Sequence, residues 1–139
     1  MNDKLPIAVD RDVLLVRKLG RERARAIGLG RADQTRLATA ISELARNVLR
    51  YAGTGTCTFL QDHPTPSQVR LQVVIEDNGP GIPDVERAME DGFSTGNGLG
   101  AGLPGTRRLV HEFALQSRPG FTRITIGMVG RSSKMSKGA

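Results

Sequence analysis

The feature that most constrains the fold of this chain is a change of hydrophobic period near residue 53. Before that point, apolar residues recur at helical spacing over residues 10–27 and again over 33–53. After it, aliphatic and β-branched residues alternate or cluster in TCTFLQ (56–61) and QVRLQVVIED (68–77), which predicts two paired strands. Helices that cannot be matched one-for-one with parallel strands favour an α+β fold. We therefore expect a two-layer α/β sandwich whose mixed, mostly antiparallel sheet carries helices on one face.

The ends of the two expected helices follow from their capping residues. Short polar side chains favour helix N-caps, and glycine favours the residue that follows a helix. Asp10 or Asp12 can cap the first helix, which should end at Gly28. Asp33 can cap the second, which should end near Gly53.

The second half of the chain is rich in glycine. A short helix is expected over 84–91, followed by a glycine-rich run over 92–105 and by helical spacing in GTRRLVHEFAL (105–115). FTRITIGMV (121–129) predicts a last strand. The end, 130–139, is polar, basic and without period, so we expect a disordered tail after a single domain that begins at residue 1 and ends at residue 129.

Composition excludes several classes of protein. At 139 residues the chain fits one domain, and its single cysteine, Cys57, excludes an intramolecular disulfide and a cysteine-rich zinc site. This usage suits a reducing cytoplasm, and no apolar run is long enough for a membrane span or a signal peptide. The net charge of +6 comes from dispersed Lys and Arg without an aromatic stacking platform, so we expect no nucleic-acid partner. An acidic protein partner and a phosphorylated small-molecule ligand would explain the positive charge equally well.

Two polar residues, Glu43 and Asn47, stand one helical turn apart in ISELARNVLRYAG. They lie at one margin of the apolar stripe that contains Leu37, Ile41 and Leu44. Such a margin can line a cleft, although an isolated pair of this kind is more often the ordinary polar edge of a helix.

The second strand ends in EDNGPGI, which places Asp77 ahead of Gly79 and Gly81. The simplest interpretation is a tight turn, because Asp-Asn-Gly favours positive φ. In the functional interpretation, Asp77 accepts a hydrogen bond from a purine amino group. A carboxylate fixed at a strand end would then distinguish adenine from guanine, which offers a carbonyl at that position.

The run STGNGLGAGLPGTRR (94–108) places its glycines ahead of an expected helix. Glycine lets backbone N–H groups approach phosphate oxygens, and a helix start adds its positive dipole end. A flexible linker is the alternative. No G-x-x-x-x-G-K-[ST] occurs, and the G-x-G-x-x-G of Gly100, Gly102 and Gly105 follows a loop instead of a strand, so neither a P-loop nor a dinucleotide-binding fold is indicated.

In this order, E-x-x-x-N, D-x-G-x-G and G-x-G-x-G resemble the motifs of the GHKL superfamily of gyrases, heat-shock-90 chaperones, histidine kinases and mismatch-repair proteins. The resemblance covers residues 10–129 and implies the Bergerat ATP-binding fold, with ATP and Mg²⁺ bound. It implies that Asn47 holds the magnesium ion, that Glu43 is the general base, that Asp77 reads adenine and that Thr122 packs beside Asp77. These roles are chemically reasonable, because Mg²⁺ needs few protein ligands when phosphates supply the others.

The same resemblance implies further contacts to the nucleotide along the two glycine motifs and the residues beside them. These are Gly79, Gly81, Ile82, Ser94, Thr95, Gly98, Leu99, Gly100, Ala101, Gly102 and Leu103.

The runs TAISELARN, YAGTG and PGIPDVERAMEDGFSTGNGLGAGLPG resemble the small anti-sigma-factor-type serine/threonine kinases, in particular the switch kinases of the bacterial stressosome. The resemblance implies a cytoplasmic, ATP-dependent kinase that phosphorylates Ser or Thr on STAS-domain proteins and then engages a downstream regulator such as a PP2C-type phosphatase. One alternative is an anti-sigma factor that binds and inhibits a sigma factor. Another is an ATP-gated binding module without turnover, against which the presence of both Glu43 and Asn47 counts.

Overall fold

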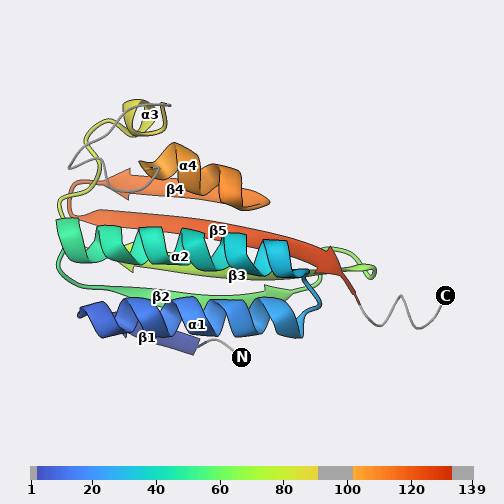
Figure 1. Ribbon diagram of the computed structural model, residues 1–139. Coiled ribbons are helices and arrows are strands. Elements are labelled where there is room, and N and C mark those ends of the chain that lie inside the picture. The colour runs from blue at the N-terminus through green and yellow to red at the C-terminus, as the bar shows by residue number, and fades with distance from the viewer. Residues whose placement is uncertain (1–2, 91–101, 133–139) are drawn as a thin grey trace.

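The computed structural model describes residues 3–90 and 102–132 (Figure 1). Within these ranges the elements are β1 (Asp3–Ile7), α1 (Asp10–Ala26), α2 (Arg31–Tyr51), β2 (Gly55–Asp62), β3 (Gln68–Asp77), α3 (Val85–Ala88), α4 (Gly102–Leu109), β4 (Glu112–Arg118) and β5 (Phe121–Arg131).

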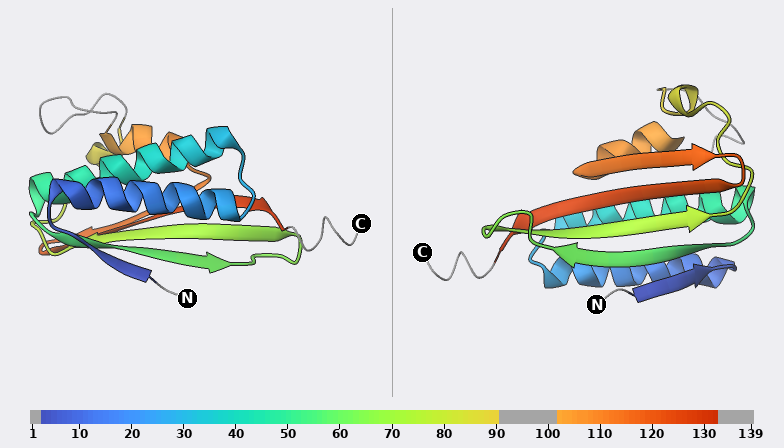
Figure 2. Two further views of the ribbon diagram at one scale, coloured as in Figure 1. Left: turned by 60° about the horizontal axis from the view of Figure 1, so that its bottom comes forward. Right: turned by 180° about the vertical axis from the view of Figure 1, so that it is seen from behind.

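The strands form one sheet in the order β1-β2-β3-β5-β4. Each described pairing is antiparallel, so the parallel component that a mixed sheet would need is absent from this part of the chain. The helices α1, α2 and α4 lie together over one face of the sheet (Figure 2). The predicted two-layer α+β architecture is therefore confirmed.

The hydrophobic core lies between the sheet and the helices. From α2, Leu37, Ile41 and Leu44 are at most 1% exposed, which confirms the apolar stripe expected from the sequence. From β3, alternate residues such as Val73 point toward the helices. Burial of each such aliphatic side chain contributes roughly 1.5–3 kcal/mol.

The starts of the two long helices differ from the expected caps. The cap of α1 is Val9, and Asp12 lies in the first turn, where its carboxylate accepts hydrogen bonds from the backbone N–H groups of Ala8 (2.8 Å) and Val9 (3.1 Å). This is the returning half of a capping box. The cap of α2 is Gly30, so Asp33 also lies in a first turn, where its charge complements the helix dipole.

The prediction of one continuous helix over 105–115 was wrong. α4 ends at Leu109, and after the turn the backbone N–H of His111 donates to the carbonyl oxygen of Gly127 (3.0 Å), which aligns β4 with β5. Along β4, the side chains of Phe113 and Leu115 face the helices and pack against the core, while the residue between them is exposed. Long-range pairing with β5 has overridden a local pattern that also fits a helix.

Three further boundaries differ from expectation. The edge strand β1 was not predicted, and the helix expected over 84–91 is reduced to the single turn of α3. β5 extends to Arg131, two residues beyond the predicted strand, and Ser132 is buried. Of the expected tail, residues 133–139 lie outside the described ranges.

Candidate functional site

The candidate site is centred on Asp77, the last residue of β3. In the sheet, Asp77 is paired with Gly55 of β2 on one side and with Thr122 of β5 on the other. Because Ile75 is buried and side chains alternate along a strand, Asp77 also points toward the helix-covered face. Its Oδ1 accepts a hydrogen bond from the backbone N–H of Gly79 (2.9 Å), so the carboxylate is oriented by its own turn.

The C-terminal end of α2 packs against this turn. A Cβ at Gly79 would lie 2.6 Å from the Cβ of Ala52, and one at Gly55 would lie 2.7 Å from Cγ1 of Val48. Both glycines therefore allow the helix end and the strand end to approach more closely than any side chain would permit. Figure 1 shows the same end of α2 lying over the end of β3.

Glu43 and Asn47 are both half-buried on α2. Asn47 immediately precedes Val48, so it belongs to the turn of α2 that meets the end of β3, whereas Glu43 lies one turn further away. The Glu43 side chain is 26% exposed and lies 3.5 Å from Nη1 of Arg46. The carboxylate therefore lies at a partly exposed margin of α2 beside a cation, and its cleft-lining position stays a prediction.

The β4–β5 hairpin holds the other side of the Asp77 turn. Gly81 has φ +83°, and a Cβ there would overlap the backbone carbonyl oxygen of Arg118. The backbone N–H of Ile82 donates to Oγ of Ser117 (2.7 Å), which lies 2.9 Å from Oγ1 of Thr122. Ser117 was missed in the sequence, because it is 35 positions from Ile82 and belongs to no motif.

The start of α4 is the third part of the candidate site that lies within the described residues. Gly102 opens the helix with φ +69°, Leu103 follows it, and Thr106 Oγ1 donates back to the Gly102 carbonyl oxygen (3.0 Å). α4 packs against α2 (Figure 1), which places the helix start in the same layer as Asn47. The other predicted contacts of the glycine-rich run lie outside the described residues: Ser94, Thr95, Gly98, Leu99, Gly100 and Ala101.

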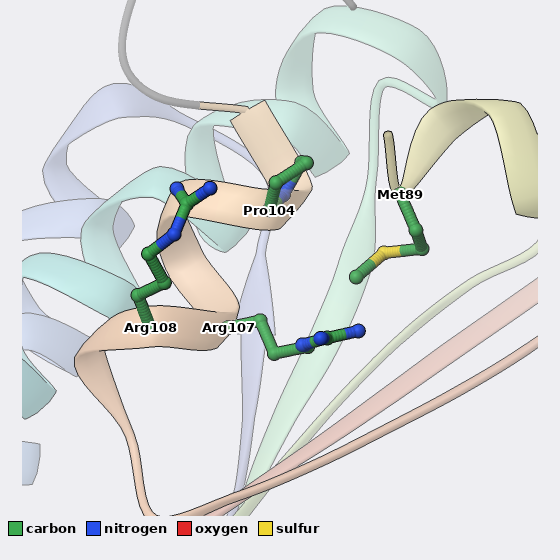
Figure 3. Close-up of a pocket in the computed structure, with 4 residues that line it drawn as sticks. All are labelled: Met89, Pro104, Arg107 and Arg108. Carbon is green, nitrogen blue, oxygen red and sulfur yellow. The ribbon is translucent and has the colours of Figure 1, made fainter. Parts of the chain in front are cut away.

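A small pocket lies between α4 and the residue that follows α3. It is lined by Met89, Pro104, Arg107 and Arg108, none of which was predicted as a site residue. Figure 3 shows the Arg107 side chain and the Met89 thioether extending toward one another across it. The Arg108 guanidinium extends away from Met89 in the same view, so Arg107 supplies the positive charge beside the apolar side chain, a combination that favours an anionic group with an apolar neighbour. The adjacent Arg107 and Arg108 are the available signal in the sequence, but two arginines in a helix do not differ in pattern from an ordinary solvated surface.

Residues 32–131 match the model of the family described as histidine kinase-, DNA gyrase B-, and HSP90-like ATPases. The chain is also 48% identical over 122 residues to the serine/threonine-protein kinase RsbT of Bacillus subtilis (strain 168), covering 86% of this chain and 91% of that protein. The chain belongs to the RsbT-like serine/threonine kinases of this ATPase family. Family membership implies that this RsbT-like kinase binds ATP.

Solved structures share the fold of this RsbT-like kinase. The RsbU and RsbW domains of Rv1364c from Mycobacterium tuberculosis align with a TM-score of 0.58 and 21% identity over 91% of this chain, which spans only 32% of that structure. The mycobacterial sensor histidine kinase MprB aligns with a TM-score of 0.51 and 25% identity, covering 95% and 99% of the two chains. The catalytic domain of histidine kinase ThkA aligns with a TM-score of 0.52 and 18% identity, covering 91% of this chain and 95% of that chain.

Among the helices in the described ranges, none combines the length and the apolar character that crossing a bilayer requires.

Proposed function

We propose that this chain is a partner-switching kinase of a bacterial sigma-factor pathway that transfers phosphate from ATP to Ser or Thr of STAS-domain proteins. It then engages a downstream regulator such as a PP2C-type phosphatase. The observation that carries the proposal is the meeting of three elements at one end of the sheet. These are the Asp77 turn, the turn of α2 that bears Asn47, and the start of α4, which packs on α2. The similarity to the serine/threonine-protein kinase RsbT supports transfer to Ser or Thr of a protein, whereas a STAS-domain substrate is what the family resemblance implies.

Asp77 is the proposed adenine-reading residue. Gly79 N–H occupies one acceptor position on Oδ1, and a carboxylate has further lone pairs on both oxygens. The amino group of adenine can donate to these, whereas guanine would direct a carbonyl oxygen at a negative charge. The half-buried position raises the cost of leaving the carboxylate without a donor, which favours adenine.

The phosphates and their magnesium ion are proposed to lie between α2 and α4. The side-chain carbonyl oxygen of Asn47 is the type of ligand that Mg²⁺ prefers, and phosphate oxygens and water complete its usual shell. The N–H groups in the first turn of α4, at Gly102 and Leu103, have no partner within the helix and carry the positive end of its dipole. Bound Mg²⁺ would supply charge neutralisation of the phosphates.

Glu43 is proposed to accept the proton of the attacking Ser or Thr hydroxyl. The hydroxyl oxygen forms a bond to the γ-phosphorus while the bond from that phosphorus to the bridging oxygen breaks, and ADP leaves with the electron pair. The proton ends on the Glu43 carboxylate. An exposed ion pair such as that with Arg46 is worth about 0–1 kcal/mol, so it does not prevent this role.

The α3–α4 pocket supports approach of an acidic protein surface to this side of the molecule. Arg107 and Arg108 are exposed there, one turn or more after the start of α4. Together with a net charge of +6, they would accelerate encounter with an acidic partner. The charge reversal Arg107→Glu should raise KM for the protein substrate while KM for ATP is unchanged, and Arg25→Glu, exposed in the last turn of α1, is the matched control.

The deciding experiment incubates the full chain with labelled ATP, Mg²⁺ and candidate STAS-domain proteins, and maps the phosphorylated residue. Glu43→Gln should bind ATP normally but transfer phosphate about 10²- to 10⁴-fold more slowly, because it lacks the base. Asn47→Ala should instead lose productive nucleotide binding. Glu22→Gln, on the exposed face of α1, is the matched control. Normal transfer by Glu43→Gln would refute the base assignment.

The two alternative functions make different predictions in the same assay. Tight binding to a sigma factor, without the need for a STAS protein, would favour an inhibitory anti-sigma factor. ATP binding without any phosphorylated product would favour an ATP-gated binding module.

A further inference from the structure

We infer that Ser117 is a positioning residue that locks the adenine-reading loop, residues 77–82, to the β4–β5 hairpin and thereby sets ATP affinity and base selectivity. This inference rests on the proposed function, since it assumes that Asp77 meets the base. It concerns a residue that lies outside each of the motifs in the sequence.

The hydroxyl of Ser117 has contacts that use its full hydrogen-bonding capacity. Its Oγ accepts from the backbone N–H of Ile82 (2.7 Å) and lies 3.3 Å from the carbonyl oxygen of Phe121, to which it can donate. It also lies 2.9 Å from Oγ1 of Thr122. A hydroxyl has one proton to donate and two lone pairs to accept. If Ser117 donates to Phe121, then Thr122 donates to Ser117, and each of the three positions is filled.

These contacts tie both ends of the loop to the same hairpin. At its start, Asp77 is paired in the sheet with Thr122, and at its end, Ile82 is held by Ser117. Between them, Gly81 lies against the carbonyl oxygen of Arg118. The Asp77 carboxylate is therefore held by a loop with two fixed ends, and Ser117 supplies a side-chain hydrogen bond from the hairpin to the loop backbone.

Loss of the hydroxyl should release the second end of the loop. In Ser117→Ala, the Ile82 N–H loses its acceptor in a partly buried position, and Thr122 loses the acceptor for its proton. Ser117 belongs to β4, which β5 separates from β3 in the sheet, whereas Glu43 and Asn47 belong to α2. The effect should therefore fall on recognition of the base and not on phosphoryl transfer.

The test measures ATP and GTP affinity by calorimetry on the full chain, together with kcat at saturating ATP. Ser117→Ala should weaken ATP binding about 5- to 30-fold, from the loss of one partly buried hydrogen bond. GTP, which does not gain from the fixed carboxylate, should be little affected, so the preference for ATP shrinks. The value of kcat should not change. Hydrogen exchange of the Ile82 amide should become faster.

Three variants control the interpretation. Ser117→Thr keeps the hydroxyl and should retain most ATP affinity. Ser67→Ala removes a hydroxyl that lies 3.2 Å from Thr65 Oγ1, in the turn between β2 and β3, and should leave ATP affinity unchanged. If Ser117→Ala fails to fold, Ser117→Cys provides a second test, because a thiol has similar shape but is a weak acceptor.

ATP affinity within twofold of the parent in folded Ser117→Ala, or an equal loss for ATP and GTP, would overturn the inference. Failure of the proposed function is distinguishable, because Asp77→Asn then also leaves ATP affinity unchanged. A strong effect of Asp77→Asn with no effect of Ser117→Ala would reject the role of Ser117 alone.

Discussion

Substitution of Gly81 tests how closely the loop of residues 77–82 approaches the β4–β5 hairpin. Two glycines in this region have nearly the same left-handed backbone, Gly81 with φ +83° and Gly120 with φ +86°. They differ in their surroundings, since a Cβ at Gly120 would meet nothing within 4 Å, whereas one at Gly81 would overlap the Arg118 carbonyl oxygen. The variant Gly120→Ala therefore isolates the backbone cost, and Gly81→Ala adds the steric cost.

The expected magnitudes follow from these two terms. A left-handed conformation costs a non-glycine residue roughly 1–2 kcal/mol, which is the whole expected loss of unfolding free energy in Gly120→Ala. Overpacking against a rigid backbone group adds roughly 1–3 kcal/mol, so Gly81→Ala should lose about 2–5 kcal/mol. The displaced loop should also weaken ATP binding in Gly81→Ala, whereas Gly120→Ala should bind ATP normally.

Equilibrium unfolding in urea and titration with ATP provide the two measurements for this pair of variants. The informative quantity is the difference between the variants, because the backbone term is common to both. Equal losses of unfolding free energy in Gly81→Ala and Gly120→Ala would refute the close approach of the loop to Arg118.

Three other expectations can be checked independently. Asp77→Asn should weaken ATP binding about 10- to 100-fold, from the loss of roughly 1.5–3 kcal/mol of a charge-assisted hydrogen bond, and unchanged affinity by calorimetry would contradict the adenine assignment. Burial raises the pKa of the Cys57 thiol to about 12, so the thiol stays protonated at pH 8. It should react with a chromogenic disulfide reagent only after unfolding in denaturant, and rapid reaction in the native state would contradict its burial. Leu44→Ala should reduce the unfolding free energy by about 2–5 kcal/mol, because Leu44 is 1% exposed in the core. A smaller loss in urea titration would indicate that neighbouring core residues fill the cavity left by the leucine side chain.

The parts of the fold that were predicted correctly are those in which local pattern and tertiary burial agree. β3 occupies the predicted residues 68–77, because its alternation of apolar and polar residues matches one buried and one open face. β4 could not be separated from a helix, because Leu109, Val110 and Phe113 also suit a helical stripe, and only pairing with β5 decides between them. β1 was not predicted because it is short and contains Pro6, a residue that disfavours central strands. It can form because an edge strand tolerates proline.

The candidate site shows the same limit. The motifs identified Asp77, Glu43 and Asn47, because each stands at a recognisable place in a helix or after a strand. The residues that hold the loop after Asp77 could not be identified in this way. Ser117 and Ala52 contact that loop only because of the register of the sheet and the packing of α2. The chemical roles of the three motif residues stay predictions, and they depend on the family resemblance more than on local pattern.

The antiparallel course of β5 has a consequence for joining this chain to other modules. Thr122, beside Asp77, and Arg131, near the last described residue, lie at opposite ends of one strand. At roughly 3.3 Å per residue they are about 30 Å apart. Arg131 thus lies at the end of the sheet opposite the Asp77 turn. A label joined directly after β5 would therefore begin at that end of the sheet and could be exchanged without direct contact with the Asp77 turn.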